Sequence, residues 1–533
     1  MQTMTQVLVI ISLSMSSPAA AGDTVVRQRG VSEALAALSS SAPALTAARM
    51  PDAGVRSVSA LMRATPRKLA QGGRSLHAHP AAVATPAPGY VNTGGTQINI
   101  DGMAAGTGAA GLAGAVGEQH YLQVAGAALA VYRKHDGVLQ LGPVSVHALF
   151  AGAGLEPCGA PGGGPASVLY DQLEKRWLIS WLAGAPGRHV QCIAVSTTAD
   201  PLGSYYRYAM KIDGAGAEAL QAEDARIALW PDAYFFTFIL FDNSHGRYRG
   251  PRICAIERLA LVRGRDAARH CKDPGPEFGP AVAASLEGDA AAPRGTPAPI
   301  VSLDFTDGGH GARLLLWRFA FSSASIGAPV ALAVEPFRTA CANLAGAACI
   351  GQPSPGTALF APGDRLMPRA AYRHDAGGET LVLTHAVQQD DGRTGLRWYE
   401  VRDPVRNPSS AVHLYQQGTH APDADHRAIG SIGIDRAGNI ALGYSVAGPT
   451  TPPGVRYAGR QRSDAPGRMQ AEEVIVNGHG VQTGPARLLA ASGALALDPA
   501  DGCTFWYTQY YLPLTGHATW RTRIASFKFR NCM

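Results

Sequence analysis

The chain has 533 residues, of which 46% are hydrophobic and 16% charged, so it is long enough to bury a large core. Its net charge of +6 is small for this length, and its arginines are scattered; a basic stripe with interleaved aromatic residues is missing, which excludes a nucleic-acid partner. The content of glycine (62) and proline (37) favours short strands and turns over long helices.

Residues 1–21 are predicted to be a signal peptide. Val7 to Met15 form a short apolar core, and Ala19 to Ala21 offer a small-residue cleavage site before Gly22. Residues 1–6 carry no Lys or Arg, so a misplaced start codon or a buried strand stays an alternative. No other stretch is long and apolar enough for a transmembrane segment. We therefore expect a secreted protein, extracellular or periplasmic.

Residues 22–95 have a different composition from the rest of the chain. They are rich in Ala, Ser and Pro, with one helix-like stretch from Ser32 to Leu38, and they end in a Pro/Ala linker from Pro80 to Pro88. Such a composition is typical of a leader or linker with little core of its own. We expect this segment to be disordered or partly helical.

From residue 96 to residue 533 a strand-and-turn pattern recurs. In each copy a turn rich in Asp, Gly or Pro precedes a run of aromatic and β-branched residues. Repeated units without an internal linker predict one all-β domain, a single seven-bladed β-propeller, because ring closure leaves no exposed strand edges. A pair of β-sandwich domains is the alternative. The copies are Gly117 to Val124, Tyr170 to Trp181, Trp230 to Leu240, Asp307 to Phe319, Asp375 to His385, Asp435 to Ser445 and Asp498 to Tyr510.

The eight cysteines support export. None lies in a C-x-x-C motif, and no group of Cys and His has the spacing of a zinc site. An even number in an exported chain indicates disulfides, and the simplest pairing joins neighbours along the chain. Free, buried thiols are the alternative. The expected pairs are Cys158 with Cys192, Cys254 with Cys271, Cys341 with Cys349, and Cys503 with Cys532.

The richest polar stretch runs from Gly363 to Arg427. Arginine binds carboxylates and other oxygen-rich groups through paired donors, so the Asp and Arg residues here could clamp an anionic or sugar ligand. The alternative is that they pair with one another and lock neighbouring blades. The expected ligand-binding residues are Asp364, Arg365, Arg369, Arg373, Asp423, Asp425 and Arg427. No catalytic motif and no metal-ligand spacing is found, so we expect no metal and no cofactor.

Several segments spread over roughly residues 110–533 form a recognisable set. They are Gly114 to Gly117, Val168 to Leu173, Arg176 to Ser180, Ile193 to Pro201, Leu229 to Tyr234, Gly363 to Met367, Arg397 to Glu400, Gly438 to Ser445, Cys503 to Tyr507 and Ser526 to Phe529. This set resembles a family of large secreted bacterial β-propeller proteins of unassigned activity. The resemblance implies export and a propeller fold, and it implies no particular activity.

The chain departs from the pattern of that family at four places. Gly111 to Ala113, Ala166-Ser167, Leu489 to Ser492 and the loop near Ser285 carry apolar or small residues where the family has acidic ones. If those carboxylates form one cation or ligand site in the relatives, this chain has lost much of it.

The sequence favours a binding or interaction module, a monomer that recognises cell-envelope glycans or another exported protein. No nucleophile or carboxylate pair stands in a recognisable catalytic context, so we expect no enzyme activity. The alternative is a glycoside hydrolase with a carboxylate pair on the propeller face, for which Asp364, Asp423 and Asp425 are the local candidates. Their convergence in an open central cavity would favour the enzyme, and pairing of each with an arginine would favour the binding module.

Overall fold

The computed structural model describes residues 24–38, 82–83, 93–104, 111–212, 220–242, 246–288, 292–305, 309–341, 348–375, 378–405, 411–484 and 492–533. The predicted signal peptide lies outside the described residues. The described part is nearly all β, and its helices are short: α1 (Leu35–Leu38), α2 (Arg258–Val262) and the 3-10 helix η1 (Val146–Phe150). Across the described ranges we find no helix of the length and apolarity that a membrane span requires.

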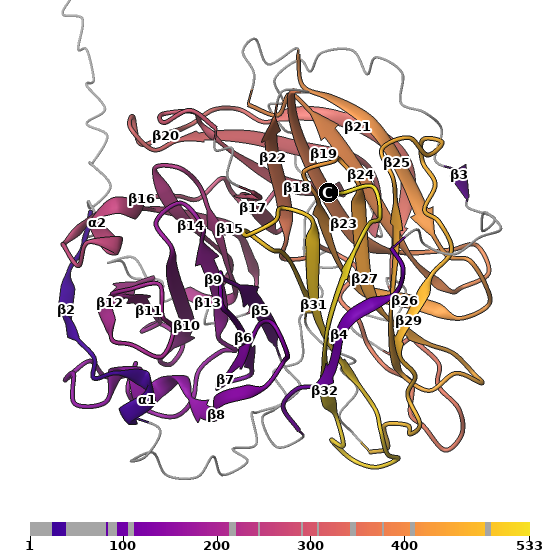
Figure 1. The fold of residues 1–533 in the computed structure, drawn as a ribbon. Helices are drawn as coiled ribbons and strands as arrows, with labels where there is room; N and C mark the ends of the chain where they lie inside the picture. Colours follow the sequence, from indigo (N-terminus) through magenta and orange to yellow (C-terminus); the bar gives the residue numbers. More distant parts are fainter. Residues whose placement is uncertain are drawn as a thin grey trace, which may run out of the picture.

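The strands form antiparallel meanders of four strands each, arranged around a common centre (Figure 1). The first strands of successive meanders contact one another in a closed ring, in the order β5, β9, β13, β17, β22, β26, β30 and back to β5. Sheets that radiate from a closed ring of inner strands make a β-propeller, so the predicted fold class is confirmed. The inner strands are β5 (Leu112–Val116), β9 (Ser167–Asp171), β13 (Leu220–Leu229), β17 (Ala281–Leu286), β22 (Ala370–Asp375), β26 (His426–Ile434) and β30 (Ala494–Leu497).

The first three meanders continue outward from β5, β9 and β13. Their remaining strands are β6 (His120–Ala125), β7 (Ala128–Arg133) and β8 (Leu139–Ser145); β10 (Arg176–Ala183), β11 (Val190–Ser196) and β12 (Tyr205–Lys211); and β14 (Ala233–Asp242), β15 (Tyr248–Glu257) and β16 (Ala267–Lys272). Strand β14 shows why these segments become strands. Its run of aromatic and β-branched residues is buried along its whole length, which suits a strand packed on both faces.

The next two meanders share one sheet, because β17 pairs in parallel with β22. Their other strands are β18 (Ala298–Phe305), β19 (His310–Ala320) and β21 (Val330–Thr339), with the short β20 (Ser325–Ile326); and β23 (Gly378–Gln388), β24 (Thr394–Arg402) and β25 (His413–His420), with β3 (Ala82–Val83) along β25. The predicted count of seven blades stays a prediction.

The last two meanders follow from β26 and β30. They contain β27 (Ile440–Ala447), β28 (Gly454–Arg460) and β29 (Glu473–Val476), and then β31 (Thr504–Tyr511) and β32 (Arg521–Lys528). The fourth strand of the last sheet is β4 (Thr96–Asp101), which pairs with β32 although it comes from the other end of the domain (Figure 1). This pairing ties the start of the propeller to its end and gives β32 a partner along its outer edge.

Residues 24–38, which the sequence assigns to the leader, lie along the outer edges of two sheets. Strand β1 (Val25–Val26) pairs with β16, and β2 (Gln28–Val31) pairs with β12. Helix α1 follows directly, and its Leu35 and Leu38 are buried in a core shared with Leu149 and Phe150. The segment therefore covers two strand edges that would otherwise be open to another chain. The division at residues 21 and 95 stays a prediction.

Four disulfides join neighbouring cysteines, as the sequence predicts. The pairs are Cys158–Cys192, Cys254–Cys271, Cys341–Cys349 and Cys503–Cys532, with sequence separations of 34, 17, 8 and 29. Cys254 and Cys271 face each other across β15 and β16, so that bond closes a strand pair within one sheet.

Candidate functional site

The ring of inner strands encloses a central cavity of about 170 Å³. Much of its wall is made of small or apolar residues, among them Gly111 to Val116 on β5 and Gly493 to Leu497 on β30. Against this background four charged side chains line the cavity: Asp224, Arg226, Glu287 and Arg369. Polar groups that converge in an otherwise apolar cavity are the usual mark of a ligand site.

Serine side chains on the inner strands, or just before one of them, fix the wall of the cavity. Each accepts a hydrogen bond from the backbone of the neighbouring inner strand, so it links two blades where they face the cavity. The bonds run from the N–H of Leu229 to Ser285 (3.2 Å), of Leu495 to Ser431 (3.0 Å) and of Leu112 to Ser492 (3.2 Å). These contacts hold the backbone in place without adding charge to the wall.

Asp224 enters the cavity from an irregular point of β13. The pairing of β13 with β14 shifts register between Glu223 and Arg226, and Asp224 has a left-handed backbone with φ of 54°. A bulge of this kind re-aims the side chain that it carries, and a non-glycine residue held at positive φ is often found at a functional site.

Two arginines hold the carboxylate of Asp224. Oδ2 of Asp224 accepts hydrogen bonds from Arg226 Nη2 (2.6 Å) and Arg365 Nη1 (3.2 Å). Burial would raise the pKa of Asp224, but the charges of Arg226 and Arg365 outweigh burial and lower the pKa to about 2. Arg365 also bonds to Asp364 at 2.9 Å. Asp224 is therefore an ionised, fixed carboxylate at neutral pH.

Arg369 and Glu287 form the second ion pair of the cavity. Glu287 follows β17 and Arg369 precedes β22, and the parallel pairing of these strands brings the two side chains into contact. The side chain of Glu287 is fully buried, whereas 26% of the Arg369 side chain is exposed. Within the described part of the chain, Oε2 of Glu287 and Nε of Arg369 have no hydrogen-bond partner. Buried polar atoms left without partners mark a place where water or a ligand would complete the bonding.

Most places where the sequence departs from the pattern of the family that it resembles lie at this cavity, and Leu489 to Ala491 lie outside the described residues. Gly111 to Ala113, Ala166-Ser167, Ser285 and Ser492 all line it. These positions carry small or apolar side chains, and among the described residues the carboxylates in the wall are those of Asp224 and Glu287.

The seven ligand-binding residues expected from the sequence fall into three places. Arg369 lines the cavity, and Asp364 and Arg365 lie behind Asp224. Arg373 lies on β22 and pairs with Asp375 at 3.3 Å. The other three residues, Asp423, Asp425 and Arg427, belong to a separate cluster at the start of β26. The chain thus brings three of the seven together and places the other four elsewhere.

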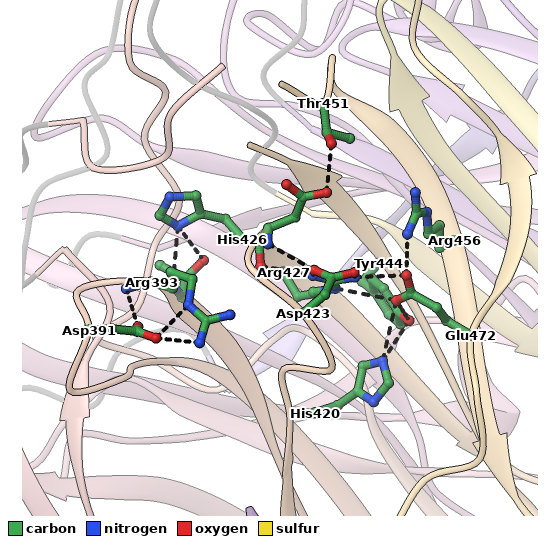
Figure 2. Close-up of polar contacts among 12 residues, drawn as sticks. Asp391, Arg393, His420, Asp423, His426, Arg427, Tyr444, Thr451, Arg456 and Glu472 are labelled. Atoms are coloured by element: carbon green, nitrogen blue, oxygen red, sulfur yellow. Dashed lines mark hydrogen bonds and ion pairs between the residues drawn. The ribbon is translucent and has the colours of Figure 1, made fainter. Parts of the chain in front are cut away.

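The separate cluster is built around Glu472 (Figure 2). Arg427 is fully buried and donates to Asp423 and, at 2.7 Å, to Glu472. Arg456 pairs with Glu472 as well, and the Tyr444 hydroxyl donates to it at 2.8 Å. Burial would raise the pKa of Glu472, but the hydrogen-bonding and charged groups around it hold the pKa far below its ordinary value. Arg427, Arg456 and Tyr444 thus all bond to the carboxylate of Glu472, so the cluster is held together internally.

His420 and Asp425 complete this cluster. His420 lies between the Tyr444 hydroxyl (2.8 Å) and Glu472 (3.5 Å), and Asp425 accepts a hydrogen bond from Thr451 at 2.7 Å. This arrangement matches the alternative in which the charged residues of the stretch pair with one another. Asp364, Asp423 and Asp425 do not line the cavity, so the carboxylate pair suggested for a hydrolase does not form there.

Sequence reasoning missed Asp224, Arg226, Glu287 and Glu472. Asp224 and Arg226 stand two residues apart in a polar stretch of β13, a weak signal that both face one side of a strand. Glu287 follows β17 and Glu472 precedes β29. No motif in the neighbouring sequence distinguishes either residue as functional. In the described ranges, no group of three or more His, Cys, Asp or Glu residues could hold a metal ion.

Comparisons with known proteins give no family for the chain. No protein-family model matches it, and no curated protein matches it. Among solved structures it is similar to a Trypanosoma rangeli sialidase in complex with the inhibitor DANA, with 8% identity and a TM-score of 0.32 over 67% of this chain and 54% of that chain. The chain thus spans about half the length of that sialidase.

Two further solved structures are similar at the same level. One is an ulvan lyase from a new family of polysaccharide lyases, with 12% identity and a TM-score of 0.38 over 81% of this chain and 97% of that chain. The other is a protein of unknown function from Dyadobacter fermentans, with 9% identity and a TM-score of 0.34 over 68% of this chain and 94% of that chain. At these values the similarities carry no argument about chemistry, so the function rests on the site itself.

Proposed function

We propose that this chain is a secreted β-propeller that binds a glycan, and that one end of the glycan enters the central cavity. The observation that carries the proposal is the pair of fixed, partly exposed charged groups in the cavity wall, Asp224 and Arg369. Carboxylate and guanidinium groups bind sugar hydroxyls well because one accepts and the other donates hydrogen bonds. The four disulfides suit an extracellular or periplasmic location.

The size of the cavity suits one sugar unit. At about 170 Å³ it is smaller than the range for drug-sized ligands, about 300–1,000 Å³, and close to the roughly 150 Å³ that accommodates one benzene ring. The cavity therefore has space for no more than one sugar ring, and the rest of a glycan would remain outside the ring of inner strands.

The geometry favours binding over hydrolysis. A glycoside hydrolase needs one carboxylic acid that keeps its proton until the leaving group departs, and such an acid has a raised pKa. Asp224 has a lowered pKa. Glu287, the other carboxylate of the cavity, is fully buried and paired with Arg369. Neither residue is placed as a proton donor to an incoming ligand.

The proposal is tested with a glycan array and with solution binding to the glycans that the array selects. We expect binding by the wild-type protein and a loss of about tenfold or more in affinity for Asp224→Asn and Arg369→Gln, since each change removes a charged hydrogen bond. The matched controls are Asp391→Asn and Arg393→Gln, a pair away from the cavity on the hairpin between β23 and β24, with side chains 48% and 30% exposed. Equal affinities for the site and control variants would contradict the assignment of the site.

A second measurement separates binding from catalysis. The protein is incubated with the bound glycan, and the release of reducing ends is followed over time. We expect no release above the background of the buffer. A release that the wild type shows and Asp224→Asn lacks would favour the glycoside hydrolase.

A further inference from the structure

The cavity presents one accessible group of each charge. Of the four charged side chains in its wall, Asp224 and Arg369 are 30% and 26% exposed, whereas Arg226 is 5% exposed and Glu287 is fully buried. The exposed carboxylate of Asp224 is therefore paired with the buried Arg226, and the exposed guanidinium group of Arg369 is paired with the buried Glu287. A ligand meets the two exposed groups, while their partners hold them in place.

The bonding of these groups leaves specific atoms for a ligand. The hydrogen bonds that Arg226 and Arg365 make to Asp224 all end on Oδ2, and no described residue donates to Oδ1. Arg369 uses Nη2 for its bond to Glu287, and its Nη1 makes no bond to a described residue and is not buried. Its Nε also has no partner among the described residues, but that atom is buried. The wall thus has a free acceptor on Asp224 and a free donor on Arg369.

The charge of the ligand follows from this arrangement. A ligand carboxylate would pair with Arg369 but would meet the like charge of Asp224 in the same small cavity, and a ligand ammonium group would meet the like charge of Arg369. A charged ligand would also lose its hydration on entry, which is costly unless it is fully paired. A hydroxyl group both donates and accepts, so a set of hydroxyls satisfies both residues without a net charge.

We infer that the central cavity takes a single uncharged sugar residue at the end of a glycan and discriminates against uronic acids and amino sugars through Asp224 and Arg369. This inference rests on the proposed function and specifies its ligand class. Asp224 accepts from one or two ring hydroxyls and excludes acidic sugars. Arg369 donates to a hydroxyl or ring oxygen and excludes cationic sugars.

The inference is tested by calorimetry with the full chain and three probes: the methyl glycosides of neutral hexoses, of hexuronic acids and of hexosamines. We expect the neutral probe to bind at least about tenfold more tightly than either charged probe. Its affinity should change little between low and high salt, because no net charge is neutralised on binding.

The variants give a readout that a loss of folding would not imitate. Asp224→Asn should weaken the neutral probe yet bring the hexuronic acid closer to it in affinity, and Arg369→Gln should do the same for the hexosamine. Asp391→Asn and Arg393→Gln should leave all three affinities unchanged. A thermal melt of each variant confirms that it is folded.

The possible failures are distinguishable. Tighter binding of the hexuronic acid or the hexosamine, lost in Asp224→Asn or Arg369→Gln, would overturn the inference and leave glycan binding at the cavity intact. Neutral binding that these variants do not change would overturn both the site and the inference. If the glycan array shows no binding and none of the three probes binds, the proposed function itself is wrong.

Discussion

Nη1 of Arg365 lies 3.2 Å from Oδ2 of Asp224, although the two residues are 141 positions apart in the chain. Arg365 lies on the approach to β22 and Asp224 on β13, and the inner strand β17 lies between them in the ring. The contact therefore connects two blades that are not neighbours, and it fixes the orientation of the exposed carboxylate in the cavity.

Arg365→Ala is expected to reduce both stability and binding. It removes one of the two arginines that hold Asp224 and breaks the buried ion pair with Asp364, and breaking a buried ion pair costs about 3 kcal/mol or more in the free energy of unfolding. Arg393→Ala, which removes an exposed ion pair, should cost less than about 1 kcal/mol. Urea unfolding measures both, and similar losses for the two variants would contradict the role given to Arg365.

The pH dependence of stability should reveal the charge of Asp224. A carboxyl group whose pKa is lowered on folding stabilises the folded state above its unfolded pKa, near 4, and loses that effect as the pH falls through its folded pKa of about 2. Above pH 5 the wild type should exceed Asp224→Asn by about 2 kcal/mol, and the gap should close towards pH 2. Asp390→Asn, at a fully exposed position, should show no gap. A gap for Asp224→Asn that does not change with pH would exclude an electrostatic origin.

The disulfides should differ in their effect on stability according to the loops that they close. Loss of Cys503–Cys532, which spans 29 residues, should cost about 3 to 4 kcal/mol in Cys503→Ala/Cys532→Ala. Loss of Cys341–Cys349, which spans 8 residues, should cost about 2.5 kcal/mol. Peptide mapping without reductant checks the pairing first. If the exported protein has free thiols, the predicted losses of stability do not apply. The cysteines then no longer support an extracellular or periplasmic location.

The segment of residues 24–38 should contribute to stability although it precedes the predicted propeller. Leu35 is 1% exposed in a core with Leu149 and Phe150, so Leu35→Ala should cost about 2 to 4 kcal/mol. The control is Val31→Ala, since Val31 lies on β2 but is 46% exposed and should cost less than about 1 kcal/mol. If Leu35→Ala leaves the free energy of unfolding unchanged, the segment does not stabilise the fold and is a removable leader.

Local features of the sequence predict the fold well. Asp136-Gly137 predicts a hairpin, and β7 pairs with β8 across it, with Gly137 at a φ of 72° that glycine adopts freely. The disulfides also join neighbouring cysteines, because each one links strands of one blade or segments that are close together in the chain. The pairing of β1 and β2 with sheet edges was not predicted, since two-residue and four-residue strands carry no periodic pattern.

The site is predictable only in part, because it depends on contacts between distant strands. The sequence predicts that Arg369 binds a ligand, and Arg369 lines the cavity, but its partner Glu287 comes from another meander. Asp224 owes its orientation to a bulge and a positive φ, which no sequence pattern announces at a residue other than glycine. Arg427 shows the reverse case. Its guanidinium group pairs with Glu472, 45 residues further along the chain. A residue that the sequence predicts to bind a ligand therefore makes an internal ion pair.

The most direct test of the central claim is a crystal structure of the protein soaked with a neutral methyl glycoside that binds in solution. We predict one sugar ring inside the ring of inner strands, with a hydroxyl within hydrogen-bond distance of Oδ1 of Asp224 and an oxygen within the same distance of the Arg369 guanidinium group. A sugar bound on the outer faces of the sheets, with the central cavity holding only water, would contradict it.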